Sequence, residues 1–205
     1  VHLAAKRNNL DIVEFLLKHP NIEINQNTFK NCSKLTKIMI PPSSTSIIPY
    51  CFFGCSSLTE IGIPVKVTEI GKFAFCECSS IEVISASSTM TNIGESAFYH
   101  CSSLKEIKIN HKSEKIASST FNGCLSLNHI IIPTSAKSID FCAFYRCKSL
   151  TIVTIPSSII KIDNNAFEEC SSLERVSFNT PYSIKSIGDF AFNGCSSLKE
   201  MTIPS

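Results

Sequence analysis

The residues that could carry chemistry through their type and regular spacing are the cysteines, of which the sequence has eleven in 205 residues. Six successive intervals of 23 residues and one of 25 separate eight of them: Cys32, Cys55, Cys78, Cys101, Cys124, Cys147, Cys170 and Cys195. Such spacing predicts a repeated unit that stacks equivalent thiols about 4.8 Å apart, within disulfide reach. Because these cysteines lie between apolar positions and the total is odd, we favour buried free thiols. The alternatives are some disulfides and, less favoured, metal binding.

Other residue types form no recognisable catalytic or metal site. Cys76 and Cys78 form a C-x-C pair without the partner cysteines that a zinc site needs. Gly54, Gly123 and Gly194 stand singly before a repeat cysteine, whereas a phosphate-binding loop needs clustered glycines, so we interpret them as turn residues. The histidines share no spacing with cysteines or carboxylates: His2, His19, His100, His111 and His129. We therefore predict that the chain is not an enzyme and needs no cofactor.

The unit around each repeat cysteine has the pattern of a short, half-buried strand. A phenylalanine lies three residues before the cysteine, and a leucine or isoleucine lies three residues after it. Two apolar residues then alternate with an exposed one, as in Ile107 and Ile109, which is the period of a β-strand. A further inward isoleucine is sometimes followed by Gly71, Gly94 or Gly188, which suits a tight turn with a permissive backbone. One such unit buries too little apolar surface to offset its backbone entropy, so we predict stacked units.

Composition and charge restrict the possible partners. With 43% hydrophobic and 18% charged residues, the chain can bury a core. Its formal net charge of +2 is too close to zero to favour nucleic acid or an anionic membrane as partner. No apolar run reaches the length of a transmembrane helix, so we predict no membrane insertion within this chain. We expect protein partners, although the sequence identifies neither the partner nor the oligomeric state.

Residues 1–25 have a different pattern from the rest. Their apolar positions follow helical spacing, and Pro20 ends the run. The segments HLAA at 2–5 and DIVEFLL at 11–17, with the closing Asn25, resemble most of an ankyrin repeat. That resemblance implies an α-helical hairpin, which needs neighbouring repeats to bury its apolar face. Because the chain opens at Val1 inside this motif, we expect further ankyrin repeats before it.

Residues 26–205 resemble the BspA-like, Treponema-type class of leucine-rich repeats, with units of the form AFxxCxxLxxIxIP followed by xxIG. There are about eight units, the last of them truncated. The resemblance implies a repeat solenoid with one short parallel strand per unit and short helical turns. It also implies an association with cell surfaces, adhesion and antigenicity. The ankyrin-like segment and the predicted free thiols instead favour the cytoplasm.

Residues that the repeat does not fix are the candidates for binding. The outward positions of the predicted strands form two columns, one from Lys37 to Glu200 and one from Met39 to Thr202. Around Ile131 and Ile152 these columns are more apolar than a solvated surface requires. We predict a partner-binding surface, called the strand face below, made of Glu106, Lys108, His129, Ile131, Ile152, Thr154 and Arg175.

Together these features favour a non-enzymatic protein–protein interaction module that combines a leucine-rich repeat scaffold with an ankyrin scaffold. The alternative is a targeting or regulatory domain of a larger intracellular protein such as a kinase. A signal peptide or membrane anchor in the full-length protein would favour the surface role, and a catalytic domain would favour the alternative.

Overall fold

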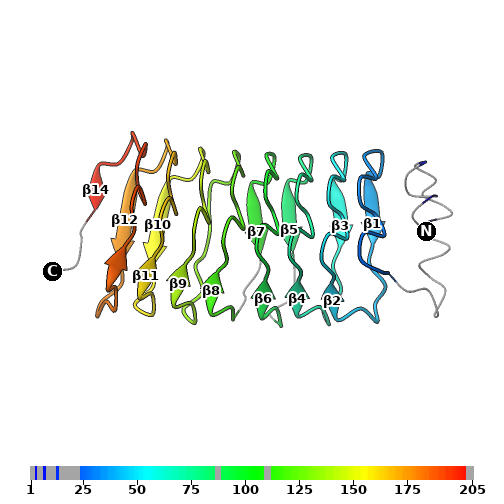
Figure 1. Cartoon of the computed structure of the whole chain (residues 1–205), viewed down its shortest axis with the longest axis horizontal. Helices are drawn as coiled ribbons and strands as arrows, with labels where there is room; N and C mark the ends of the chain where they lie inside the picture. The colour runs from blue at the N-terminus through cyan, green and yellow to red at the C-terminus, as the bar shows by residue number, and fades with distance from the viewer. Residues whose placement is uncertain are drawn as a thin grey trace.

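The computed structural model describes Leu3, Arg7, Val13 and residues 24–85, 89–108 and 112–201. From residue 24 onward the described residues form a parallel β-solenoid of about seven turns, which lie side by side in Figure 1. Each turn, called a rung below, is one sequence repeat, because paired strand residues lie 23 or 25 positions apart. The predicted solenoid is therefore confirmed.

A first row of strands forms the upper part of Figure 1. The pairings between its described strands are parallel, and they join β1 to β3, β5 to β7, and β10 to β12 and β14. These strands are β1 (Lys37–Met39), β3 (Glu60–Gly62), β5 (Val83–Ser85), β7 (Glu106–Lys108), β10 (Ile152–Ile155), β12 (Arg175–Phe178) and β14 (Glu200–Met201). Equivalent residues face each other in register, as in Lys37 opposite Glu60 and Ile152 opposite Arg175, so the predicted outward columns are confirmed here.

A second row of two-residue strands, the lower row in Figure 1, lies at the further inward isoleucine of each unit. It comprises β2 (Ser46–Ile47), β4 (Glu69–Ile70), β6 (Asn92–Ile93), β8 (Lys115–Ile116), β9 (Ser138–Ile139), β11 (Lys161–Ile162) and β13 (Ser186–Ile187). The prediction of one strand per rung is therefore wrong. Two residues are too few to show a period of two in the sequence, and only pairing with neighbouring rungs makes them strands.

The first row is interrupted between β7 and β10. Residues 128–133, which include His129 and Ile131, do not form a strand. Their inward residues Ile130 and Ile132 are nevertheless buried, at 7% and 4% exposure. The alternating pattern of the sequence thus correctly predicts burial at this rung, but not the hydrogen-bonded pairing that defines a strand.

The third side of each rung consists of hydrogen-bonded turns, so the prediction of short helical turns is wrong for the described rungs. Cys78 N donates to Phe75 O at 3.0 Å, and Ile81 N donates to Cys78 O at 3.3 Å. A residue with φ between 56° and 75° precedes each repeat cysteine and prevents a continuous helix. These residues are Asn31, Gly54, Glu77, His100, Gly123, Arg146, Glu169 and Gly194, so the three predicted turn glycines are confirmed.

Gly71, Gly94 and Gly188 have a different role from the one predicted, because none of them has a positive φ. A Cβ at Gly71 would lie 2.6 Å from Pro49 N, and one at Gly94 would lie 2.6 Å from Lys72 N. Both contacts are to the backbone of the preceding rung. The glycines therefore permit two rungs to approach closely, and they do not supply a left-handed turn.

A stack of phenylalanine rings runs through the core of the solenoid. Successive ring centroids lie 5.0–5.6 Å apart, and the ring planes are within 1–12° of parallel. The stack contains Phe29, Phe52, Phe75, Phe98, Phe121, Phe144, Phe167 and Phe192. Because each ring contacts rings from neighbouring rungs, the core is continuous along the array.

The ankyrin-type hairpin predicted for residues 1–25 lies almost entirely outside the described residues. Val13 is buried and belongs to the same core cluster as Phe29. In the part of the chain that the structure describes, no helix has the length and apolar character that crossing a membrane requires.

Candidate functional site

The repeat cysteines form a column of hydrogen-bond donors inside the core. Each Sγ from Cys55 to Cys195 lies 3.0–3.2 Å from the backbone oxygen of the phenylalanine that begins the preceding unit. All eleven cysteines are free, so the prediction of buried free thiols is confirmed, with Cys195 only partly buried. A thiol that donates a hydrogen bond must be protonated, which fits a structural role.

Burial also suppresses the reactivity of these thiols. It raises the pKa of Cys55 and Cys76 to about 12 and that of Cys195 to about 11. For the fully buried Cys101, burial raises the pKa well above its usual range. The thiolate is the nucleophile and the metal ligand, so a protonated column favours neither chemistry. Among the described residues, no group of three or more His, Cys, Asp and Glu side chains is placed to hold a metal ion.

The strand face is partly assembled by the structure. Ile152 and Arg175 face each other in register on β10 and β12, and Thr154 lies opposite Ser177. Ile131 and Ile152 are 69% and 49% exposed, and His129 is also exposed. Glu106 is half-buried on β7, and the side chain of Lys108 lies outside the described residues.

Some polar side chains of the strand face already interact with side chains on neighbouring rungs. Arg175 Nε lies 2.9 Å from Glu200 Oε2, and the hydroxyls of Thr154 and Ser177 are 3.3 Å apart. The two isoleucines have no such engagement, so they are the groups with most to gain from a partner. Sequence reasoning left Met39 and Val83 out of the face, although both are exposed and their apolar character in outward columns was visible.

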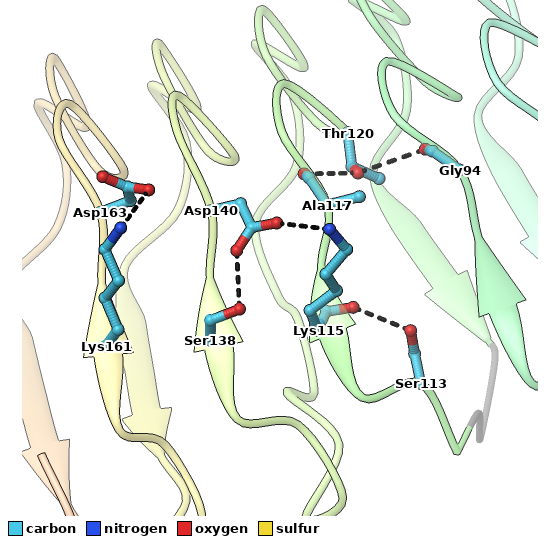
Figure 2. Close-up of polar contacts among 9 residues, drawn as sticks. All are labelled: Gly94, Ser113, Lys115, Ala117, Thr120, Ser138, Asp140, Lys161 and Asp163. Carbon is cyan, nitrogen blue, oxygen red and sulfur yellow. Dashed lines mark hydrogen bonds and ion pairs between the residues drawn. The ribbon is translucent and has the colours of Figure 1, made fainter.

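The second row of strands carries a polar surface that is satisfied internally, as Figure 2 shows. Lys115 Nζ lies 3.0 Å from Asp140 Oδ2, and Ser138 Oγ donates to Asp140 Oδ1 at 2.6 Å. On the next rung Lys161 Nζ donates to Asp163 Oδ2 at 2.8 Å, and this hydrogen bond lowers the pKa of Asp163. Because these charges already pair with each other, the surface is a weaker candidate for binding than the strand face.

Comparison with known proteins agrees with this architecture. The family model for the BspA type leucine rich repeat region, in six copies, matches residues 22–151 and 114–205. No curated protein matches the sequence at a significant level.

Three solved structures are similar over most of the chain. A leucine-rich repeat protein from Eubacterium ventriosum is 26% identical with a TM-score of 0.71, and the match covers 82% of this chain and 44% of that one. One from Bacteroides ovatus is 31% identical with a TM-score of 0.64, covering 83% and 49%. The T. pallidum leucine rich repeat protein is 25% identical with a TM-score of 0.58, covering 89% and 74%. The chain thus spans about half the length of the first two.

The family match extends over more than half of the residues, and the observed rungs follow the same repeat. Strand pairs, phenylalanine stack and cysteine column all recur in this chain with a spacing of 23 or 25 residues. The chain belongs to the family of proteins with a BspA type leucine rich repeat region.

Proposed function

We propose that the chain is a non-enzymatic recognition module that binds a protein partner through the strand face. The observation that carries this proposal is the exposure of Ile131 and Ile152 on neighbouring rungs of a stacked scaffold. Burying apolar surface contributes about 25 cal/mol per Å², so a partner that covers both side chains gains stability. The face has no phenylalanine, tyrosine or tryptophan, which leaves the isoleucines as its anchors.

The polar residues around these anchors supply specificity. His129 and Arg175 are both exposed beside Ile152, and each can donate a hydrogen bond to a partner. The ion pair of Arg175 with Glu200 is solvent-exposed, so it contributes little to stability and can rearrange. A polar rim around an apolar centre is the usual anatomy of a protein–protein interface.

The test is the double substitution Ile131→Glu and Ile152→Glu in the full chain. Affinity capture from a lysate of the source organism identifies candidate partners, and each purified candidate is then titrated directly. We expect the double variant to bind at least about tenfold more weakly, because two charges replace the apolar anchors. Folding should be unchanged, since both positions are exposed.

The control is Val65→Glu, which introduces one glutamate at an exposed apolar residue outside the strand face. This variant should bind like the wild type. Equal binding by the wild type and the double variant would overturn the proposal, as would equal losses in the double variant and the control.

A second candidate is a targeting or regulatory domain of a larger intracellular protein such as a kinase, with the ankyrin-type hairpin as part of its scaffold. The thiol hydrogen bonds favour this candidate, because they require reduced cysteines and reducing compartments maintain them. The compartment of the captured partner distinguishes this candidate from a surface adhesin.

A further inference from the structure

One column of turn residues departs from the repeat in two adjacent rungs. The residue after the repeat cysteine is serine in six rungs, whereas Leu125 and Lys148 occupy the two adjacent rungs between them. Both side chains are exposed, so packing in the core does not require them. In the column before the cysteine, the same rungs carry Gly123 and Arg146, with His100 on the rung before.

The surface is hollowed beside these two residues. A groove of about 510 Å³, called the turn groove below, is lined by residues that include His100, Ser102, Gly123, Leu125, Arg146 and Lys148. A Cβ at Gly123 would collide with the imidazole of His100. The missing side chain therefore opens the hollow between His100 on one side and Arg146 on the other.

This end of the groove carries two cationic side chains, Arg146 and Lys148. Arg146 gives its Nε and Nη2 to Glu169, at 2.8 and 3.3 Å, and its Cζ lies 5.1 Å from the centroid of the Tyr145 ring. Lys148 Nζ lies close enough to the same carboxylate to act on its charge: the hydrogen bond from Arg146 lowers the pKa of Glu169 most, and Lys148 lowers it further. The lining carboxylate, Glu77, lies two rungs before Gly123 in the same column.

We propose that the turn groove binds an extended acidic peptide, with a carboxylate in the Gly123 hollow and an apolar side chain on Leu125. The lining residues span five rungs, which at about 4.8 Å per rung gives about 19 Å, the length of roughly six extended residues. A carboxylate beside Lys148 and Arg146 complements their charge. Nucleic acid would need several phosphate contacts, and only two full cations line the groove. This surface is separate from the strand face, so the proposal is independent of the function proposed above.

The variant that tests this proposal restores the repeat, with Leu125→Ser and Lys148→Ser together. Serine occupies this column in six other rungs, so the variant should fold like the wild type, which circular dichroism and thermal unfolding check. The matched control, Lys34→Ser, also removes an exposed cation at a position where the other rungs carry serine, but outside the groove. The probes are peptides selected from a random-peptide phage library on the full wild-type chain, and oligothymidylate as a polyanion.

We expect the selected peptides to be rich in aspartate and glutamate, and to bind the double variant at least about tenfold more weakly than the wild type and the control. Selected peptides without acidic residues, or acidic peptides that bind all three proteins equally, would overturn the proposal. The proposal would also be overturned if no acidic peptide bound, and if oligothymidylate bound the wild type but not the double variant. None of these outcomes depends on Ile131 or Ile152, so the strand-face proposal stands or falls separately.

Discussion

Cys101 shows how the repeat uses a thiol as a structural group. Its Sγ lies 3.0 Å from Phe75 O, which also accepts a hydrogen bond from Cys78 N. Ionisation would place a negative charge beside this oxygen in an apolar core, and burial accordingly raises the pKa of the thiol. The cysteine therefore fills space and satisfies a carbonyl only while it is protonated.

This raised pKa predicts that the protein loses stability in alkaline solution. An unfolded thiol releases its proton above its ordinary pKa of 9.0, whereas the folded Cys55 holds its proton until about pH 12. Stability is thus fully present below about pH 9 and falls as the pH rises toward the folded pKa. At pH 10 each buried thiol should cost about 1.4 kcal/mol of unfolding free energy. Urea unfolding at pH 7 and pH 10 under reducing conditions measures this loss.

Other groups also titrate between these pH values, so a variant that lacks one buried thiol isolates the effect. Cys101→Ala should be less stable than the wild type at pH 7, because it leaves a small cavity. Its further loss between pH 7 and pH 10 should be smaller than that of the wild type by about the contribution of one thiol. Equal pH-dependent losses in both proteins would contradict the assignment.

At the scale of the elements, the sequence predicted the features that depend on which residues are buried. It missed the features that depend on hydrogen-bonded pairing between rungs. The outward columns and the inward isoleucines follow from alternation along a single unit, and the structure confirms both. Strand β2 has only two residues, and its existence depends on β4 of the next rung, so no local pattern could predict it. The same reason explains Gly71, whose role is a contact with the backbone of another rung.

Of the two candidate surfaces, the strand face could be predicted from the sequence and the turn groove could not. Ile131 and Ile152 are visible in the sequence as apolar residues in outward columns, and their exposure is confirmed. The turn groove could not be predicted, because the hollow at Gly123 depends on how the His100 side chain lies against the next rung. What the sequence did contain was the departure of Leu125 and Lys148 from the serine column.

Gly71→Ala tests the close approach between rungs. The new Cβ would lie 2.6 Å from Pro49 N and 2.9 Å from Ile47 O, both backbone atoms that cannot move aside easily. We expect a loss of about 1–3 kcal/mol in unfolding free energy, measured by urea denaturation. The comparison variant is Gly54→Asn, because Asn31 already occupies that column with a positive φ of 58°.

Gly54→Asn should cost less than about 1 kcal/mol, since asparagine tolerates the left-handed region and the nearest atom is the end of an exposed side chain. If Gly71→Ala destabilised the protein less than Gly54→Asn, the close approach of two rungs would not be the reason for glycine at position 71. The assignment of the two glycine classes would then have to be reversed.

For the whole molecule, stability is distributed through contacts between neighbouring rungs. Phe98 is buried between Phe75 and Phe121, with centroid distances of 5.4 and 5.6 Å. Phe192 stacks on Phe167 at 5.3 Å and is only partly buried, as are Cys195 and Leu198 in the same rung. Opening the Phe192 rung therefore breaks one of the described ring contacts, whereas opening the Phe98 rung breaks two.

The column of cysteines provides a reporter in every rung for testing this distribution. In native buffer with iodoacetamide, we expect Cys195 to be alkylated first and Cys101 and Cys124 last, as followed by mass spectrometry of peptides. Cys195 is partly exposed and its pKa is raised only to about 11, while the central thiols are fully buried. Dividing each rate by that of the same cysteine in the urea-unfolded chain removes differences in intrinsic reactivity. Rungs that open locally should then show a graded series of rates, because each opening has its own free energy. A single common rate for all cysteines would instead mean that the array unfolds as one cooperative unit. In that case the interfaces between rungs would be strong enough that the rung of Cys195 opens only when the central rungs open.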